Sequence, residues 1–220
     1  MKKNISAVLF DLDGTLLDTA GDLGQALNQL LTTRKMAPIP QQIIRPVAGY
    51  GCAGLLKIGF DMDKDHPEFS PLCNELLDEY FNYFCTTTEF FPGMEKVLQH
   101  LEDNKLPWGI VTNKPKRFTT PLMKHLGLEQ RAACIISGDT LKKSKPDPDQ
   151  ILHACELLAF DPATCVYIGD SKVDILASRA AGIPVLAALY GYIPPGENPL
   201  SWEADGYINH PEEILDWLGG

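Results

Sequence analysis

Residues 5–15 read ISAVLFDLDGT, a short apolar run that ends abruptly in Asp11 and Asp13 and an Asp-Gly turn. Similar apolar runs recur later, and each predicts a buried strand. These runs are residues 108–112, 132–137, 165–169 and 183–188. Amphipathic segments of crossover length lie between the later runs, at residues 115–126, 147–158 and 172–181. The pattern therefore predicts an α/β fold built on a parallel sheet.

A different pattern separates the first two predicted strands. Residues 22–34, 39–47, 51–60 and 67–85 all have a helical pattern and contain no strand signal. This block is too long for one crossover, so it predicts a small helical cap inserted after the first strand. We assign residues 17–84 to the cap and residues 1–16 and 85–220 to the catalytic core, with hinges near 17–19 and 86–89.

Composition narrows the classes of partner. The chain has 220 residues, of which 45% are hydrophobic, and a formal net charge of −10 without a basic run. Nucleic acid and anionic membrane surfaces demand clustered Lys and Arg, so neither is expected as a partner. No apolar stretch approaches the roughly 20 residues of a membrane span, and residues 1–4 begin no secretory signal. We expect a cytoplasmic protein, monomeric or homodimeric.

Six cysteines are present, and none forms a C-x-x-C pair. Most have apolar neighbours in the sequence, which is typical of reduced core thiols and not of disulfides or zinc ligands. They are Cys52, Cys73, Cys85, Cys134, Cys155 and Cys165.

Polar, reactive side chains follow the predicted strands. Parallel α/β sheets bind their ligands at the carboxyl ends of strands, so residues at these points are expected to meet at one edge. In chain order they are Asp11 and Asp13, then Thr112 and Asn113, then Lys145 in the loop 144–146, then Asp170 and Asp174.

Such a cluster predicts phosphoryl chemistry. Grouped carboxylates repel one another unless a cation holds them, and oxygen-only ligands select a hard ion such as Mg²⁺. Asp11 and Asp170 are the expected direct ligands, and a substrate phosphate oxygen normally completes such a shell. Lys145 and the Thr112 hydroxyl supply a cation and a donor for the other phosphoryl oxygens.

The Asp-x-Asp spacing divides two tasks. Alternate residues leaving a strand point differently, so Asp11 can face phosphorus while Asp13 lies beside the leaving oxygen. Asp11 is then the nucleophile, and Asp13 is the acid that protonates the alkoxide and the base that activates water. Gly14 continues a tight turn that lets backbone N–H groups approach the phosphate.

Four motifs resemble those of the haloacid dehalogenase superfamily of phosphatases. They are residues 11–18 (DLDGTLLD), 111–113 (VTN), 145–148 (KPDP) and 169–174 (GDSKVD), in the order that the family shows. The match spans nearly the whole chain, and it implies a Rossmann-like core with a C1-type helical cap. The subgroup that the chain resembles contains phosphoglycolate phosphatases and phosphatases of N-acetylmuramic acid 6-phosphate.

The resemblance also implies residue roles. Asp11 would be nucleophile and Mg²⁺ ligand, Asp13 would give its backbone carbonyl to the metal, and Asp170 would give its side chain. Asp174 would be an outer-shell acceptor or a water-mediated ligand. Lys145 would orient Asp11 and neutralise the phosphate, which Thr112 and Asn113 would bind.

The G-x-G-x-x-G pattern at residues 49–54 lies in the helical insert and follows no convincing strand, so a nicotinamide site is not expected. It is better interpreted as a cap loop facing the active site, with Arg45 and Tyr50 as candidates to meet the non-phosphate part of the substrate. Solvated surface positions are an equal alternative for both. The loop 189–196 either lines the site or packs against it.

Several functions remain open. We expect a Mg²⁺-dependent phosphomonoesterase acting on 2-phosphoglycolate or a sugar phosphate, with N-acetylmuramic acid 6-phosphate as an alternative. A phosphomutase would use the same aspartyl-phosphate chemistry, and a binding protein could keep the fold without activity. A dehalogenase would need neither Asp13 nor the metal carboxylates, so the presence of Asp13, Asp170 and Asp174 counts against it. A phosphonate hydrolase would need a cap lysine, Lys57 or Lys64, to form a Schiff base, but the subgroup resemblance points elsewhere.

Overall fold

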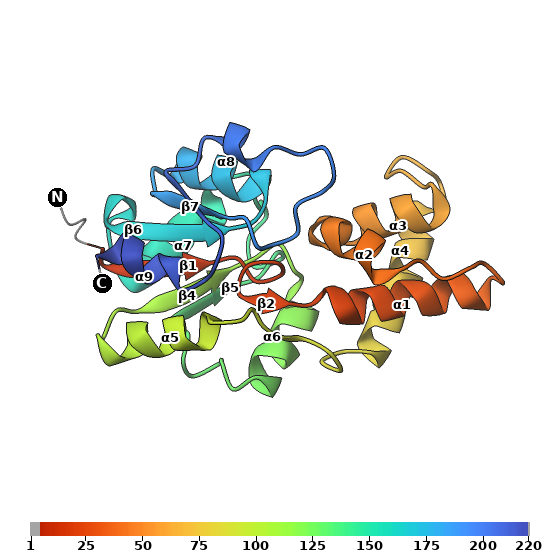
Figure 1. The fold of residues 1–220 in the computed structure, drawn as a ribbon, viewed down its shortest axis with the longest axis horizontal. Coiled ribbons are helices and arrows are strands. Elements are labelled where there is room, and N and C mark those ends of the chain that lie inside the picture. The colour runs from red at the N-terminus through yellow and green to blue at the C-terminus, as the bar shows by residue number, and fades with distance from the viewer. Residues whose placement is uncertain (1–4, 220) are drawn as a thin grey trace.

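The structure, a computed structural model, describes residues 5–219. Residues 1–4 and 220 lie outside this range. The expectation about a secretory signal and the two ends of the predicted core fall on these residues. A six-stranded parallel sheet forms the centre of the molecule (Figure 1). In spatial order its strands are β5 (Cys134–Ile136), β4 (Trp108–Val111), β1 (Ala7–Phe10), β6 (Cys165–Gly169), β7 (Val185–Ala188) and β8 (Gly206–Ile208). The predicted α/β fold with a parallel sheet is confirmed.

Side-chain alternation along the central strand builds two apolar faces. Val8 and Phe10 of β1 enter one hydrophobic cluster, and Ala7 and Leu9 enter the other. The first face is covered by α5 (Met94–Asp103), α6 (Lys116–His125) and α9 (Glu213–Leu218), and the second by α7 (Asp149–Leu158) and α8 (Lys172–Ala181). With both faces buried, the strands are apolar throughout, which explains why their sequence runs are continuous.

The strand β8 and the helix α9 are absent from the sequence-based prediction. The strand has three residues, of which only Ile208 is buried, so it carries no apolar run. It pairs with β7, and the Asp205 carboxylate accepts a hydrogen bond from Val185 N at 2.9 Å. Tertiary pairing, and not local sequence preference, makes this segment a strand.

Two short strands flank the segment assigned to the cap, and the described residues between them form helices and loops. The strands β2 (Leu17–Asp18) and β3 (Glu89–Phe90) pair antiparallel where the chain leaves and re-enters the core. Figure 1 shows the helices beside the ends of the sheet strands. They are α1 (Ala20–Thr33), α2 (Gln41–Ile44), the 3₁₀ helix η1 (Arg45–Tyr50), α3 (Cys52–Phe60) and α4 (Phe69–Asn82). Two further 3₁₀ helices, η2 (Pro162–Thr164) and η3 (Pro199–Trp202), lie in core loops.

Apolar packing holds the cap helices together. Leu27 of α1, Leu56 of α3 and Leu76 of α4 are buried in the hydrophobic cluster that also contains Phe10 of the sheet. Each buried leucine contributes about 1.5–3 kcal/mol relative to an exposed one. None of the helices formed by residues 5–219 has the length and apolar character needed to cross a membrane.

One pair of cysteines differs from the expectation of reduced thiols. Cys52 at the start of α3 and Cys73 in α4 form a disulfide, with their Cα atoms 5.6 Å apart. The expectation was wrong for this pair because the packing of α3 against α4 brings together residues that no sequence motif links. Cys85, Cys134, Cys155 and Cys165 are free.

A buried carboxylate joins the two hinge connections. Asp22, in the first turn of α1, is 0% exposed and accepts four hydrogen bonds from the returning connection. The donors are the hydroxyls of Thr86, Thr87 and Thr88 and the backbone N–H of Thr87, at 2.6–2.9 Å. Burial alone would raise the pKa of Asp22, but these hydrogen bonds outweigh it and lower the pKa.

We expect Asp22→Asn to lower the free energy of unfolding by about 2 kcal/mol near neutral pH, because an amide cannot accept all four hydrogen bonds. Since the pKa of Asp22 is lowered by folding, its contribution is complete above the unfolded pKa and is lost as pH falls through the folded one. The difference between variant and wild type should therefore shrink below about pH 4. Denaturant unfolding at stepped pH measures this, with exposed Asp78→Asn as control. A difference that stays constant with pH would contradict the assignment.

Candidate active site

The candidate nucleophile lies where β1 ends. Asp11 N donates to Ile168 O at 2.8 Å, so the pairing with β6 continues one residue beyond the end of β1. The chain then enters a turn. The Asp11 Oδ1 atom lies 2.9 Å from the Lys145 Nζ atom. Burial raises the pKa of Asp11, the Lys145 ammonium opposes this and Asp174 adds to it, so the pKa reaches about 7. A second cation beside Asp11 would keep it ionised at lower pH.

Lys145 is anchored from several sides. Its ammonium donates to Asp174 Oδ1 at 2.6 Å, to the Tyr167 hydroxyl at 2.8 Å and to Val111 O at 3.1 Å. Burial alone would lower the pKa of Lys145, but Asp11 and Asp174 raise it, so the cation persists in the site. The lysine side chain is therefore held rigidly with its charge next to the nucleophile.

The Asn113 side chain is held by the loop that carries Lys145. Its side-chain amide donates to Lys145 O at 2.9 Å, and its Oδ1 atom accepts from Lys145 N at 3.1 Å. Both polar groups are thus engaged by the backbone of the loop that carries the lysine. Asn113 positions Lys145, and this contact was not evident from the sequence.

The acidic residues meet as a cluster suited to a cation. Oxygen atoms of Asp11, Asp170 and Asp174 all lie within 4.8 Å of one another. Asp170 Oδ1 accepts from the Thr15 hydroxyl at 3.0 Å, and Oδ2 accepts from Tyr192 N at 2.8 Å. Burial, Asp11 and Asp174 raise the pKa of Asp170 well above its usual range. A hard divalent cation fits this oxygen-only donor set, because it would offset the repulsion that raises these pKa values.

Asp174 is held by neighbours on both of its carboxylate oxygens. It lies in the first turn of α8, where Ser171 N and the Ser171 hydroxyl donate to Oδ2, while Lys145 and Tyr167 donate to Oδ1. Both carboxylate oxygens are therefore already engaged. This geometry suits an outer acceptor that orients Lys145.

Asp13 pairs with a lysine that the sequence analysis missed. Lys114 Nζ lies 2.9 Å from Asp13 Oδ1, which also accepts from the Thr19 hydroxyl at 2.6 Å. The Lys114 ammonium lies 4.8 Å from the ring centre of Tyr80 in α4, so it joins the core to the cap. The available signal was its position directly after Thr112 and Asn113, in the loop that follows β4.

Gly14 lies in the turn that follows β1. Its N–H donates to Leu17 O at 3.0 Å and is not free for a phosphate. Gly14 has φ +91°, and a Cβ atom there would lie 2.1 Å from Asp170 Oδ2. Glycine is needed because the turn must pass the Asp170 carboxylate at close range. Thr112 is buried and lines the cavity described next.

A cavity of about 560 Å³ connects these residues with the cap. Asp11, Asp13, Thr112, Asn113, Lys114 and Lys145 line it from the core. The glycine-rich segment contributes Gly49, Tyr50, Gly51 and Cys52, so the predicted cap loop does face the site. The Tyr50 hydroxyl donates to Glu197 Oε1 at 3.0 Å, which links this loop to the core.

Arg45 is engaged at the hinge. Its guanidinium pairs with the Asp18 carboxylate of β2 and lies 5.2 Å from the ring centre of Tyr192. The Tyr192 hydroxyl accepts from Thr19 N at 2.7 Å and donates to Asp18 Oδ1 at 2.9 Å. Because Tyr192 N also binds Asp170, one residue of the loop after β7 joins the acidic cluster to the cap hinge. The loop 189–196 therefore packs against the site.

Comparison with known proteins agrees with this geometry. A family model described as haloacid dehalogenase-like hydrolase matches residues 8–188. The chain belongs to the haloacid dehalogenase-like hydrolases. This haloacid dehalogenase-like hydrolase is 38% identical over 217 residues to the N-acetylmuramic acid 6-phosphate phosphatase of Pseudomonas aeruginosa. The aligned region covers 99% of this chain and 96% of the relative. It is 41% identical over 210 residues to the phosphoglycolate phosphatase of Xanthomonas campestris pv. campestris, covering 96% and 95%.

A solved structure supports the fold. The crystal structure of a predicted phosphoglycolate phosphatase from Haemophilus somnus superposes with a TM-score of 0.83 at 22% identity, over 97% of each chain. The family resemblance inferred from the four motifs is confirmed. This haloacid dehalogenase-like hydrolase is a phosphatase, that is, a phosphoric monoester hydrolase.

Proposed function

We propose that the enzyme hydrolyses a small phosphorylated metabolite in a Mg²⁺-dependent reaction that passes through an aspartyl-phosphate on Asp11. The observation that carries this proposal is the contact between Asp11 and the buried Lys145 ammonium, 2.9 Å long, at the wall of the cavity. A carboxylate held against a buried cation, beside two further carboxylates, is arranged for attack on a phosphoryl group.

In the first step an Asp11 oxygen attacks phosphorus, and the bond from phosphorus to the ester oxygen breaks. Asp13 gives its proton to the leaving alkoxide, so the alcohol departs neutral. Lys145 and the Thr112 hydroxyl stabilise the charge on the phosphoryl oxygens, and Lys114 orients Asp13 by donating to its Oδ1 atom.

In the second step the Asp13 carboxylate takes a proton from water. The resulting hydroxide attacks the aspartyl-phosphate, inorganic phosphate leaves, and Asp11 is restored. Lys145 stays charged throughout because Asp174 and Asp11 surround it. The cap excludes bulk water, so that only the water activated by Asp13 reaches phosphorus.

Asp11, Asp170 and the Asp13 carbonyl would hold Mg²⁺, with Asp174 outside this set. Bound there, the ion supplies charge neutralisation of the phosphoryl oxygens. Buried Asp170 needs such a cation, because its neighbours Asp11 and Asp174 are both acidic.

The names of the relatives support two substrates. Proteins 41% and 38% identical to this chain are named phosphoglycolate phosphatase and N-acetylmuramic acid 6-phosphate phosphatase, so 2-phosphoglycolate and sugar phosphates are the compounds to test first. A phosphomutase is the second candidate, because it would share the aspartyl-phosphate step. We propose no nucleic-acid or membrane partner, and a monomer or homodimer.

The deciding measurement is phosphate release from p-nitrophenyl phosphate with Mg²⁺ and with EDTA. We expect release with Mg²⁺ and a loss of at least about a hundredfold with EDTA, since metal charge stabilises the transition state by several kcal/mol. Equal rates in both buffers would contradict the metal assignment. No release from p-nitrophenyl phosphate or from any metabolite tested would contradict hydrolysis and favour a mutase or a binding protein.

A further inference from the structure

The charges that line the cavity do not balance within it. Five charged residues line it, and four of them form two ion pairs, Asp11 with Lys145 and Asp13 with Lys114. The fifth is Lys64, which belongs to the cap. Among residues 5–219, no ion pair or hydrogen bond holds its ammonium.

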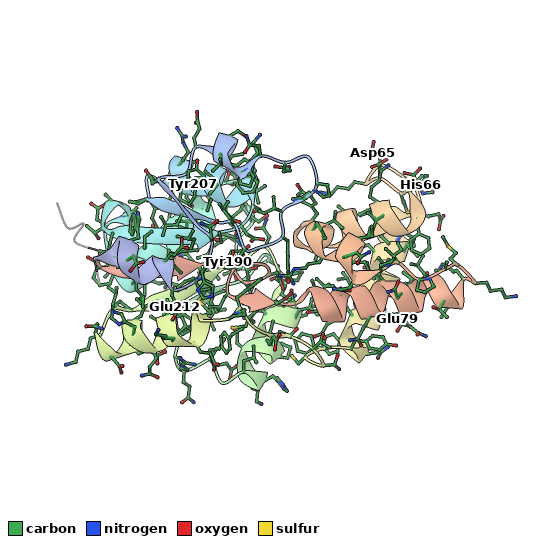
Figure 2. The ribbon with its side chains drawn as sticks, viewed as in Figure 1. Asp65, His66, Glu79, Tyr190, Tyr207 and Glu212 are labelled. Atoms are coloured by element: carbon green, nitrogen blue, oxygen red, sulfur yellow. A yellow bond between two sulfur atoms is a disulfide. The ribbon has the colours of Figure 1, made fainter. Side chains whose placement is uncertain are left out.

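Two acidic residues that precede Lys64 in the chain, Asp61 and Asp63, pair with another lysine. Lys57 Nζ pairs with Asp61 Oδ1 at 2.8 Å and with Asp63 Oδ2 at 2.9 Å. Lys64 follows in the connection between α3 and α4, and the next residues, Asp65 and His66, lie at the rim of the cap (Figure 2). Asp61 and Asp63 thus share Lys57, and neither of them pairs with Lys64, which lines the cavity.

Lys64 is exposed but lines the cap side of the cavity, where its charge can attract an anionic group of the substrate other than the phosphate. The phosphate would be held at the core side of the cavity by the proposed divalent cation and by Lys145, which lies 2.9 Å from Asp11. The protein as a whole carries −10 and repels anionic substrates at long range. A lysine at the cap side of the cavity therefore favours a substrate with a second negative group, away from phosphorus.

The size and lining of the cavity indicate what part of the substrate lies between its phosphate and its second negative group. The cavity volume of 560 Å³ lies within the range of about 300–1,000 Å³ that is typical of ligand pockets. A pocket of this size holds molecules larger than a two-carbon acid. The cap wall is apolar, with Leu23, Leu55, Leu76 and Leu77. Such a wall suits the ring and acetamido methyl of an amino sugar better than a fully hydrated acid.

We propose that Lys64 is a specificity-determining residue that binds the carboxylate of a phosphorylated sugar acid, while Asp11 and Lys145 hold its phosphate. This inference rests on the proposed phosphatase function and narrows it. Lys64 acts by an ion pair remote from the reacting atoms, so it contributes to binding of the ground and transition states alike.

Two substrates that differ in one carboxylate test the proposal. N-acetylmuramic acid 6-phosphate carries a lactyl carboxylate that N-acetylglucosamine 6-phosphate lacks. For the acid, Lys64→Gln should raise KM about tenfold with kcat unchanged, because a charge-assisted contact is lost. For the neutral sugar, both constants should stay within about twofold of wild type. Lys64→Arg should keep the preference for the acid, which also separates an ion pair from Schiff-base chemistry.

Controls separate this proposal from the phosphatase function. Exposed Lys35→Gln removes another cap lysine and should leave both substrates unaffected. Loss of KM preference in Lys64→Gln, with p-nitrophenyl phosphate hydrolysis intact, supports the proposal. An equal loss for both sugars, an unchanged KM for the acid, or a higher kcat/KM for 2-phosphoglycolate than for the sugar acid would overturn it. If wild type releases no phosphate even from p-nitrophenyl phosphate, the proposed function itself fails.

Discussion

Asp11→Asn should lower phosphate release by at least about four orders of magnitude, because an amide oxygen is a poor nucleophile and the aspartyl-phosphate can no longer form. Asp11 is the lining carboxylate that faces Lys145, and the isosteric change keeps its shape. Phosphate release with Mg²⁺ measures the loss, and mass spectrometry of the quenched enzyme shows whether a phosphorylated aspartate is formed. A rate near wild type would refute the assignment of Asp11 as nucleophile.

Stability measurements test whether the loss of activity in Asp11→Asn is caused by unfolding. Folding raises the pKa of Asp11 from 3.8 to about 7, so the native state holds a proton more tightly than the unfolded chain does. In EDTA the ionised carboxylate therefore destabilises the fold as pH rises through this interval. Asp11→Asn should be at least as stable as wild type at about pH 8 in EDTA, because it removes the charge that burial and Asp174 disfavour while Lys145 keeps Asp174 as a partner. Exposed Asp78→Asn is the control for loss of an aspartate.

Lys145→Met should lower both activity and stability. Its ammonium contacts Asp11 and Asp174, and removing one partner of a buried ionic group costs about 3–5 kcal/mol of unfolding free energy. Loss of the cation beside the phosphoryl group should lower kcat by at least about a thousandfold. Denaturant unfolding and phosphate release measure the two effects.

Lys143→Met is the matched control, because Lys143 is an exposed lysine two residues away that pairs with Asp147 on the surface. It should change unfolding by less than about 1 kcal/mol and leave kcat unchanged. A Lys145→Met enzyme that unfolds like the Lys143→Met enzyme would show that the buried network does not depend on this lysine. A Lys145→Met enzyme with normal kcat would exclude Lys145 from the phosphoryl site.

The sheet and most of the acidic site were predictable from sequence because both follow local rules. Apolar runs such as residues 165–169 are strands because both of their faces are buried, and β6 has these bounds. Asp11 and Asp170 follow parallel strands that neighbour each other, so their meeting is a consequence of strand direction. Such positions depend on a few residues around each strand end.

Other features depend on contacts between segments far apart in the chain. Asp22 and Thr87 are 65 positions apart, and only the return of the chain through β3 makes them partners. The same holds for Tyr192, which binds Asp170 and the hinge, and for the disulfide between Cys52 and Cys73. No spacing rule relates these residues, so the sequence carried no readable sign of them.

The parallel α/β core, the order of the motifs and the carboxylates at the strand ends follow from the sequence, because periodicity and strand direction are local properties of the chain. Tertiary structure alone decided which side chains complete the site: Lys114 beside Asp13, Asn113 on the Lys145 backbone, and Lys64 at the cavity wall. These placements depend on how the cap helices pack against the strand ends. That packing is fixed by the sum of many weak apolar contacts and not by any one residue pattern.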